Sequence, residues 1–269
     1  MGKGVHSLLA KKKRGEKIVS LTAYDCPTAR LEEEAGLDFI LVGDSMAMAV
    51  FGDETTLSAD IDVMIAHTRA VRRGAPNTLV VGDMPFGTYE CSDSQAVMNA
   101  VRFLARGGAD AVKLEGGNRR MLSRVSAIID SGIPVMGHLG LLPQSIRKTG
   151  GYRVVYSKDR EQLFQEALAL QEAGIFALIL EGVEEKLAGE LTRELRIPTV
   201  GIGAGRYTDG QILVVTDMLG LSGDFRPRFL KVYAELGSAI RSAVESYSSE
   251  VREGAFPGEE HAYHPREEK

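Results

Sequence analysis

Carboxylate residues close several apolar, β-branched runs of this chain. Asp44, Asp83 and Glu115 each stand at the end of such a run. If folding brought them together, they would repel one another and resist the loss of water unless a cation neutralised them. Mg²⁺ takes oxygen ligands, often one or two carboxylates together with water or substrate oxygens. The three carboxylates therefore predict a magnesium site, and the lack of a cysteine or a histidine pair beside them argues against zinc.

Three further ionisable residues stand at the ends of apolar runs. Lys113 precedes Glu115 by two residues, so both side chains would share one face of a strand. Its ammonium either neutralises the carboxylates or binds an anionic substrate. His138, within GHLGLLPQS at 137–145, either polarises an oxygen and shuttles a proton or is a hydrogen-bonded structural histidine. Glu181 follows the run FALIL and suits a general base, with a structural ion pair as the alternative.

Other chemistry-bearing residues give weaker signals. The glycine-rich GIGAG at 201–205 either holds a phosphate on backbone N–H groups or allows close backbone packing. Cys26 and Cys91 are in no CxxC spacing, which favours free cysteines in a reducing cytosol over a disulfide framework or a redox pair. His261 and His264, three apart near the C-terminus, form either a metal pair or part of a surface tail, and the tail is favoured.

The elements that must position these residues follow a strand-then-helix rhythm. Apolar runs predict strands at 18–23, 39–42, 79–82, 111–114, 134–138, 177–180, 199–202 and 211–215. Helical patterns lie at 59–73, 92–106, 119–129, 159–173 and 184–195, with glycines 107, 132 and 174 just past helix ends. Eight such strands predict a TIM (β/α)₈ barrel, in which the carboxyl ends of the strands carry the chemistry. A doubly wound open sheet is the alternative, and the absence of GxGxxG after the first strand disfavours it.

Composition bounds the class of protein. The chain has 269 residues, 44% of them hydrophobic, and a formal net charge of −5, which is ordinary for a globular protein. The acidic balance argues against a nucleic-acid partner or an anionic membrane surface. No apolar run approaches the roughly 18 residues that a membrane span needs. We therefore expect one cytoplasmic barrel domain over 1–269, with a solvated basic leader at 11–14, a C-terminal amphipathic helix at 230–249 and a polar tail.

Eight ordered segments resemble one family. They are TAYD (22–25), LVGDS (41–45), HTRAVRRGAP (67–76), GDMPF (82–86), VKLEGG (112–117), GHLGLLPQS (137–145), GIGAG (201–205) and DGQILVVTDMLG (209–220). Together they resemble the ketopantoate hydroxymethyltransferase family, whose barrel belongs to the phosphoenolpyruvate/pyruvate superfamily. The resemblance covers the chain from near residue 20 to the FPGEEHAYH ending at 264.

The resemblance implies an activity and a set of site residues. It implies transfer of a hydroxymethyl group from 5,10-methylenetetrahydrofolate to 3-methyl-2-oxobutanoate, giving 2-dehydropantoate and tetrahydrofolate in pantothenate biosynthesis. It implies Mg²⁺ on Asp44, Asp83 and Glu115, with stabilisation of an enolate by the metal. The keto acid would contact Asp44, Ser45, Asp83, Lys113 and His138, and Glu181 would accept its proton. The family also implies a homo-oligomer, a decamer of two pentameric rings, to which the C-terminal helix would contribute.

Two other functions compete with this one. A C–C lyase or mutase of the isocitrate lyase or phosphoenolpyruvate mutase type commonly uses a catalytic cysteine in a flexible loop, and neither Cys26 nor Cys91 lies in a KKCGH-like motif. A non-catalytic barrel would be expected to have lost a metal carboxylate or the base, and all of them are present.

Overall fold

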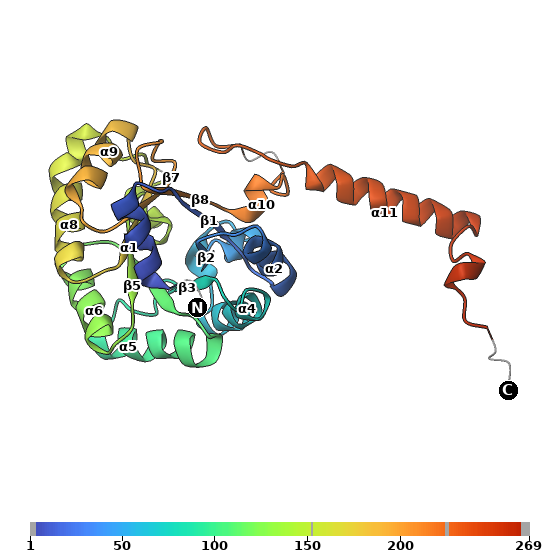
Figure 1. Cartoon of the computed structure of the whole chain (residues 1–269), viewed down its shortest axis with the longest axis horizontal. Coiled ribbons are helices and arrows are strands. Elements are labelled where there is room, and N and C mark those ends of the chain that lie inside the picture. The colour runs from blue at the N-terminus through green and yellow to red at the C-terminus, as the bar shows by residue number, and fades with distance from the viewer. Residues whose placement is uncertain (1–3, 152, 224–225, 265–269) are drawn as a thin grey trace. The chain divides into compact units, whose positions relative to one another are not determined.

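A closed barrel of parallel strands forms the core of the chain. The computed structural model describes residues 4–151, 153–223 and 226–264. The strands are β1 (Ile18–Thr22), β2 (Phe39–Val42), β3 (Leu79–Asp83), β4 (Ala111–Glu115), β5 (Val135–Gly140), β6 (Ala177–Glu181), β7 (Thr199–Ile202) and β8 (Gly210–Leu213). Each pairs in parallel with the next, and β8 pairs with β1 to close the ring (Figure 1). The predicted (β/α)₈ barrel is confirmed.

The observed strands agree with the predicted ones to within two residues at each end. The predictions at 39–42 and 199–202 match β2 and β7 without change. Strands β3, β4 and β6 each run one residue further than predicted and take in Asp83, Glu115 and Glu181. These carboxylates are therefore held by the strand backbone itself and not by a loop.

Helices cover the outside of the barrel (Figure 1). They are α2 (Cys26–Glu34), α4 (Ile61–Gly74), α5 (Asp93–Arg102), α6 (Arg119–Asp130), α8 (Arg160–Glu172) and α9 (Glu185–Glu194). The one-turn helices α3 (Met46–Ala49) and α7 (Ile146–Thr149) lie in the connections that follow β2 and β5. Shorter turns lie at Thr56–Ser58, Phe103–Gly107, Pro143–Ser145 and Ser157–Asp159. Side-chain caps explain several helix starts. At α4 the Asp60 carboxylate accepts the N–H groups of Asp62 and Val63, which have no partner within the helix.

Helix ends follow the glycines, with one correction. Gly132 and Gly174 have φ of 89° and 99°, as predicted for residues just past a helix. Gly107 does not lie past a helix end. The π-helical turn Phe103–Gly107 carries the helix further, so the left-handed position falls on Gly108, with φ of 73°.

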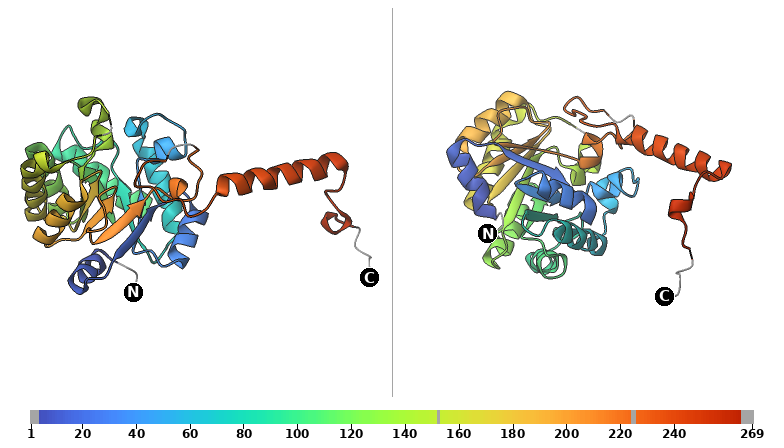
Figure 2. Two further views of the ribbon diagram at one scale, coloured as in Figure 1. Left: turned by 90° about the horizontal axis from the view of Figure 1, so that it is seen from above. Right: turned by 45° about the vertical axis from the view of Figure 1, so that its right-hand side comes forward.

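The basic N-terminal segment is a helix, α1 (Val5–Arg14), rather than a solvated leader. Leu8 is fully buried in the apolar cluster inside the barrel, together with Ile18 and Phe39 at the starts of β1 and β2. Figure 2 shows α1 beside the start of β1, at the amino ends of the strands. A helix places apolar and basic residues on different faces, so the same short segment can bury a leucine and still present lysines.

Two of those lysines fasten α1 to the barrel. Lys11 Nζ lies 2.6 Å from Asp38 Oδ2, and Lys12 Nζ lies 2.8 Å from Asp209 Oδ2. Both aspartates directly precede strands, β2 and β8. The predicted solvated basic run therefore forms ion pairs at the amino ends of the strands.

The connection from β7 to β8 departs from the regular pattern. The described residues 203–209 between these strands form no helix, whereas most other connections of the barrel contain one. The outer face of β1 is correspondingly exposed, and the Val19 side chain is 51% accessible.

The chain divides into two compact units, of which the barrel is the first, comprising residues 1–215 and 227–230. The second contains residues 216–226 and the chain from 231 onward, and its main element is α11 (Leu236–Glu253). The predicted helix at 230–249 thus begins six residues later and ends four later. A short helix, α10 (Val215–Met218), and a turn at Glu259–His261 complete the described elements. The expectation of one barrel domain with a C-terminal extension stays a prediction.

Candidate active site

Alternation along the strands directs ionisable side chains into one end of the barrel. The interior apolar cluster includes residues of four neighbouring strands, among them Val81, Ala111, Met136 and Ile179. Two residues further along the same strands, and so on the same face, stand Asp83, Lys113, His138 and Glu181. The barrel interior is therefore apolar through its middle and ionisable at the carboxyl ends of β3 to β6.

The strand register brings these residues into direct neighbourhood. Asp83 is the register partner of Lys113, and Glu115 is the partner of His138. Asp44 follows β2, and its backbone N–H donates to Asp83 Oδ2 at 3.1 Å. The predicted convergence of the three carboxylates at one end of the barrel is thus observed.

Lys113 lies at the centre of this group. Its Nζ is 2.8 Å from Asp83 Oδ1 and 3.7 Å from Glu115 Oε1. It also lies 3.2 Å from His138 Nδ1. One ammonium therefore contacts side chains from three adjacent strands.

His138 joins the centre of the group to Glu181. Its Nδ1 lies 3.3 Å from Glu115 Oε1, and its Nε2 lies 3.3 Å from Glu181 Oε2. The Glu181 side chain is 21% exposed, whereas that of His138 is 4% exposed. Glu181 is thus the carboxylate of this group that remains open to a solvent-borne molecule.

Burial and mutual charge shift the titration of the group. Burial raises the pKa of Asp44 well above its usual value, and the neighbouring carboxylates Asp83 and Glu115 raise it further. Burial also raises the pKa of Asp83, although Lys113 opposes the shift. Three carboxylates around one lysine leave an excess of negative charge that the buried site resists.

Glu115 and the two cations shift the opposite way. Burial alone would raise the pKa of Glu115, but Lys113 and His138 lower it. Burial would lower the pKa of Lys113, but Asp83, Glu115 and Asp44 raise it. Burial and Lys113 would likewise lower the pKa of His138, yet hydrogen bonds to Glu115 and Glu181 raise it to about 9. Glu115 is thus stabilised as the anion, with Lys113 and His138 as cations.

Two residues that the sequence did not single out complete the site. Gln144, in the turn Pro143–Ser145, donates from Nε2 to Asp44 Oδ2 at 2.9 Å and from its backbone N–H to Glu115 Oε2 at 3.1 Å. Tyr89, in the connection after β3, donates its hydroxyl to Gln144 Oε1. Glutamine and tyrosine in loops carry no signal in a strand-end pattern. Only the marked PQS within GHLGLLPQS pointed to this segment.

Ser45 lies on the β1 side of the site. Its Oγ is 2.9 Å from Tyr24 Oη, which also accepts a hydrogen bond from Thr22 Oγ1 at 3.0 Å. Tyr24 follows β1 and is almost fully buried. The serine hydroxyl is therefore positioned by strand-end residues next to Asp44.

The donor set suits a hard divalent cation, although the carboxylates are not arranged as a finished metal cage. Among the residues that the structure describes, no three His, Cys, Asp or Glu side chains form a metal-holding group. Lys113 lies between Asp83 and Glu115. The three carboxylates are buried and outnumber the two cations beside them, Lys113 and His138. Mg²⁺ would neutralise this excess of buried negative charge, and it needs only one or two carboxylates beside water.

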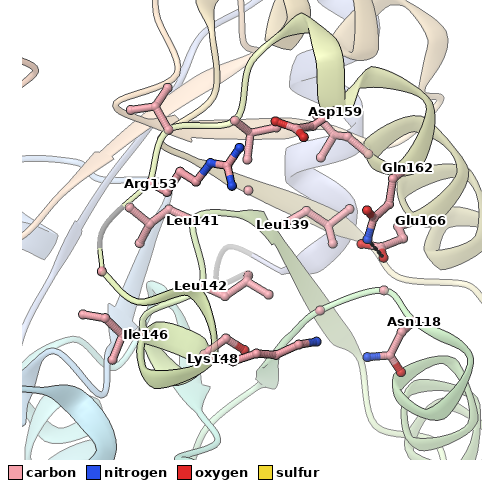
Figure 3. A pocket seen from close by; sticks show the side chains of 18 residues that line it. Asn118, Leu139, Leu141, Leu142, Ile146, Lys148, Arg153, Asp159, Gln162 and Glu166 are labelled. Atoms are coloured by element: carbon pink, nitrogen blue, oxygen red, sulfur yellow. Dashed lines mark hydrogen bonds between the residues drawn. The ribbon is translucent and has the colours of Figure 1, made fainter.

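A separate cavity of about 320 Å³ adjoins this group (Figure 3). Its lining includes Leu142 and Ser145, which flank Gln144, but none of the ionisable residues of the site. Figure 3 shows Arg153 and Asp159 on one side and Lys148 and Asn118 on the other. The segment around Gln144 therefore separates the buried carboxylates from a second, more open space.

The glycine-rich segment at 201–205 is explained by packing. A Cβ on Gly203 would lie 2.9 Å from the Phe229 ring, and one on Gly205 would lie 2.3 Å from Glu185 Cγ. Both glycines also have positive φ, 62° and 75°. Of the two roles considered for this segment, close approach of the backbone to its neighbours accounts for the residue type.

The remaining sequence candidates lie outside the site. Cys26 and Cys91 are free. His261 and His264 are exposed, as expected of a surface tail, and His261 Nδ1 lies 3.6 Å from Glu260 Oε1. Within the described residues, no helix combines the length and the apolar character that a bilayer span requires.

Comparisons with known proteins agree on one family. The sequence profile of ketopantoate hydroxymethyltransferase matches residues 3–259. A 3-methyl-2-oxobutanoate hydroxymethyltransferase of Desulfotalea psychrophila is 50% identical over 98% of this chain and 95% of its own length. The protein of the same name from Moorella thermoacetica is 51% identical over 95% of this chain and 96% of its own.

Solved structures with low sequence identity share the fold. A phosphonopyruvate hydrolase, solved in complex with oxalate and Mg²⁺, matches with a TM-score of 0.61 and 15% identity, covering 97% of this chain and 93% of its own. A 2,3-dimethylmalate lyase of the PEP mutase/isocitrate lyase superfamily matches with a TM-score of 0.62 and 19% identity, covering 98% and 93%. At these identities the likeness concerns the barrel and not the reaction.

Proposed function

The chain belongs to the ketopantoate hydroxymethyltransferase family, and from that premise we propose how its buried carboxylates carry out the transfer. It is an enzyme that transfers a hydroxymethyl group to 3-methyl-2-oxobutanoate. The observation that carries the proposal is the convergence of Asp44, Asp83 and Glu115 around Lys113, with Glu181 more exposed beside them. Enolisation of an α-keto acid is promoted by a metal that binds two of its oxygens and by a carboxylate that accepts its proton. This group offers ligands for the metal and a carboxylate for the proton.

We assign Mg²⁺ to Asp44, Asp83 and Glu115. The excess of buried negative charge supports the assignment, because three carboxylates face only two cationic side chains, Lys113 and His138. When bound, the ion would supply Lewis-acid stabilisation of the negative charge that develops on the keto acid. Asp44 and Asp83 would then titrate as anions, because a cation beside them offsets the burial and the carboxylate repulsion that raise their pKa.

Polar side chains on either side would hold the keto acid. Ser45 presents a hydroxyl beside Asp44, and Lys113 and His138 present cationic groups that suit a carboxylate or a developing oxyanion. The sequence resemblance assigns the carboxylate end to Lys113 and a keto-acid contact to Ser45. Both residues border the metal ligands, as such contacts require.

Glu181 is the proposed base. Its carboxylate is 3.3 Å from His138 Nε2 and is the most exposed of the group, so a bound keto acid can reach it. Glu181 would accept the proton from C3 of 3-methyl-2-oxobutanoate and leave an enolate. His138 would hold the carboxylate in place while the proton moves.

We propose 5,10-methylenetetrahydrofolate as the one-carbon donor. The enolate carbon would attack the methylene carbon, forming the new C–C bond while one of the two C–N bonds of the methylene bridge breaks and that nitrogen takes up a proton. Water would then break the second C–N bond, giving its hydroxyl to the one-carbon unit and a proton to the nitrogen, which releases 2-dehydropantoate and tetrahydrofolate. Water supplies the hydroxyl of the product, so no oxidant or reductant is needed.

A homo-oligomer, and specifically a decamer, is proposed as the working assembly. Helix α11 (Figure 1) has no buried residue, yet it carries an apolar stripe of Leu236, Ile240, Val244, Tyr247 and Val251 at helical spacing. Such a stripe is stabilised by a partner surface, and other copies of the chain would provide it. Light scattering of the purified chain tests the size. We place the enzyme in the cytoplasm, where two free cysteines are compatible with reducing conditions.

The experiment that tests the function is a single incubation. The purified chain, 3-methyl-2-oxobutanoate, 5,10-methylenetetrahydrofolate and Mg²⁺ are combined, and 2-dehydropantoate is measured. We expect product that depends on all four components and that disappears with EDTA. Cleavage of a dicarboxylic or phosphonate substrate without this transfer would favour the lyase or mutase alternative, and full turnover in EDTA would contradict the metal assignment.

A further inference from the structure

The three site carboxylates share a pattern of hydrogen bonding. Each has one oxygen held by a fixed donor: Asp44 Oδ2 by Gln144 Nε2, Asp83 Oδ2 by the backbone N–H of Asp44, and Glu115 Oε2 by the backbone N–H of Gln144. The other oxygens of Asp83 and Glu115 face cations: Asp83 Oδ1 lies 2.8 Å from Lys113 Nζ, and Glu115 Oε1 lies 3.3 Å from His138 Nδ1. Two of the three donors belong to one residue, Gln144.

The orientation of the Gln144 amide is fixed by its surroundings. Nε2 faces two acceptors, Asp44 Oδ2 at 2.9 Å and the backbone oxygen of Met84 at 3.1 Å. Oε1 accepts the Tyr89 hydroxyl, and the backbone N–H of Glu115 lies 3.4 Å from the same Tyr89 oxygen. Reversing the amide would set its oxygen against a carboxylate and a carbonyl. Gln144 and Tyr89 are also almost completely buried, so water cannot replace these contacts.

We propose that Gln144, held in its orientation by Tyr89, is the residue that positions Asp44 and Glu115 for the metal. The inference rests on the proposed function, in which these carboxylates bind Mg²⁺. By holding Asp44 Oδ2 and Glu115 Oε2, Gln144 fixes the direction in which each carboxylate presents its other oxygen to the centre of the site, where the cation would bind. It contacts neither substrate nor metal and acts through its two partners, as hydrogen-bonding residues behind metal ligands commonly do.

The chemistry of the side chain explains why glutamine stands here. A glutamate would set a fourth carboxylate against Asp44 and lose the donor. A methionine of similar length would fill the space without donating. Both changes leave the backbone N–H bond to Glu115 in place, so the expected loss arises from the side-chain contact with Asp44.

The test measures metal binding separately from activity. Free Mn²⁺ is titrated into the apo chain and followed by electron paramagnetic resonance, for the wild type, Gln144→Met, Tyr89→Phe and the control Gln162→Met. Gln162 lies on helix α8, and within the described part of the chain its side chain hydrogen-bonds to Glu166 and to no residue of the site. We expect Gln144→Met to weaken Mn²⁺ binding about 10- to 100-fold, Tyr89→Phe to weaken it less, and Gln162→Met to leave it unchanged.

Catalysis provides a second readout that a purely structural role would not change. In Gln144→Met the Mg²⁺ concentration for half-maximal transfer should rise by the same factor as the Mn²⁺ dissociation constant, while kcat at saturating Mg²⁺ recovers to within a few fold. A lower Tm with unaltered metal dependence would instead indicate packing alone and would overturn the inference.

The outcomes separate this inference from the proposed function. If the wild type binds Mn²⁺ and catalyses the transfer but Gln144→Met binds the ion equally well, the positioning role is wrong and the function stands. If the wild type binds no divalent ion, both are contradicted. Should Gln144→Met fail to fold, Tyr89→Phe decides: weaker Mn²⁺ binding supports the role, and binding equal to that of the wild type overturns it.

Discussion

The two ends of the barrel are built from the same strands and contain opposite kinds of side chain. At the amino ends, Leu8, Ile18 and Phe39 are fully buried among apolar neighbours, and charge occurs in matched pairs such as Lys12 with Asp209. At the carboxyl ends, Asp44, Asp83, Lys113, Glu115 and His138 are all 5% exposed or less. Their carboxylates outnumber the cations that they contact directly.

The difference shows where this fold is stabilised and where it performs chemistry. Apolar burial at the amino ends of the strands, the floor of the barrel, contributes to stability and does not depend on a ligand. At the carboxyl ends, the mouth of the barrel, buried negative charge in excess of the cations lowers the free energy of unfolding until a cation or substrate binds. Substitutions at the two ends should therefore separate activity from stability, and the predictions below run from the largest expected effect to the smallest.

Asp83→Asn should remove activity without removing stability. Loss of this charge should lower the rate of transfer about a thousand-fold, equivalent to about 4 kcal/mol of transition-state stabilisation. Because burial raises the pKa of Asp83, its charged form is disfavoured in the folded chain, and a neutral isostere should leave the Tm unchanged or higher. The product assay and thermal unfolding measure the two effects. Transfer by Asp83→Asn at the wild-type rate would contradict the role of the Asp83 charge in the reaction.

Leu8→Ala should produce the reverse result at the floor. Removing a fully buried leucine costs about 2–5 kcal/mol of unfolding free energy. The kcat of the folded enzyme should stay within a few fold, since Leu8 lies at the opposite end from Glu181. Urea unfolding measures the loss, with Leu31→Ala as the control because that side chain is 66% exposed. Equal losses of unfolding free energy in the two variants would mean that burial of Leu8 by α1 does not stabilise the barrel.

Glu32→Gln should stabilise the chain in a pH-dependent way. Glu32 on α2 is buried with both carboxylate oxygens unpaired, and burial together with Asp25 raises its pKa to about 8. The folded state therefore holds a proton that the unfolded state releases near pH 4.5. As the pH rises from there to 8, the wild type should lose up to about 1.4 kcal/mol per pH unit through this group.

The amide has no such titration. Unfolding curves of the two chains should coincide near pH 4.5 and diverge toward pH 8, with Glu32→Gln more stable and activity unaffected. A constant difference at every pH would contradict the titration of Glu32. Glu32 is thus a buried ionisable group outside the carboxyl-end site, and burial keeps it neutral in the folded chain without a charged partner.

Lys12→Met should give the smallest effect. The ammonium is partly exposed and bonds Asp209 and the backbone oxygen of Thr192, both at 2.8 Å. Loss of such a pair costs about 1 kcal/mol. Lys13→Met is the matched control, because Lys13 is exposed on the same helix. Chemical unfolding at low and high salt resolves the two variants, and no difference between them would remove Lys12 from the anchoring of α1.

The sequence predicts those parts of this molecule that depend on periodicity. Apolar β-branched runs define the eight strands, and period-two alternation is enough to bring Asp83, Glu115 and Glu181 to one end of a barrel. The contacts of Gln144 and Tyr89 depend on the paths of two irregular connections 55 residues apart, which no local pattern specifies.

Helix α1 escaped prediction for a related reason. Its run of basic residues conceals the single buried Leu8, because charge dominates the composition of a short amphipathic helix. Here tertiary packing, rather than propensity, decides the outcome.

The most direct test of the mouth as a site of enolisation is proton exchange at C3 of 3-methyl-2-oxobutanoate in D₂O, followed by NMR without any folate. The wild type should catalyse exchange of the C3 proton in the presence of Mg²⁺, and the exchange should stop when EDTA is added. Glu181→Gln should exchange it at least about 100-fold more slowly while binding Mn²⁺ as tightly as the wild type. Undiminished exchange in Glu181→Gln would remove Glu181 as the base, and exchange by the wild type in EDTA would contradict the role of the carboxylates.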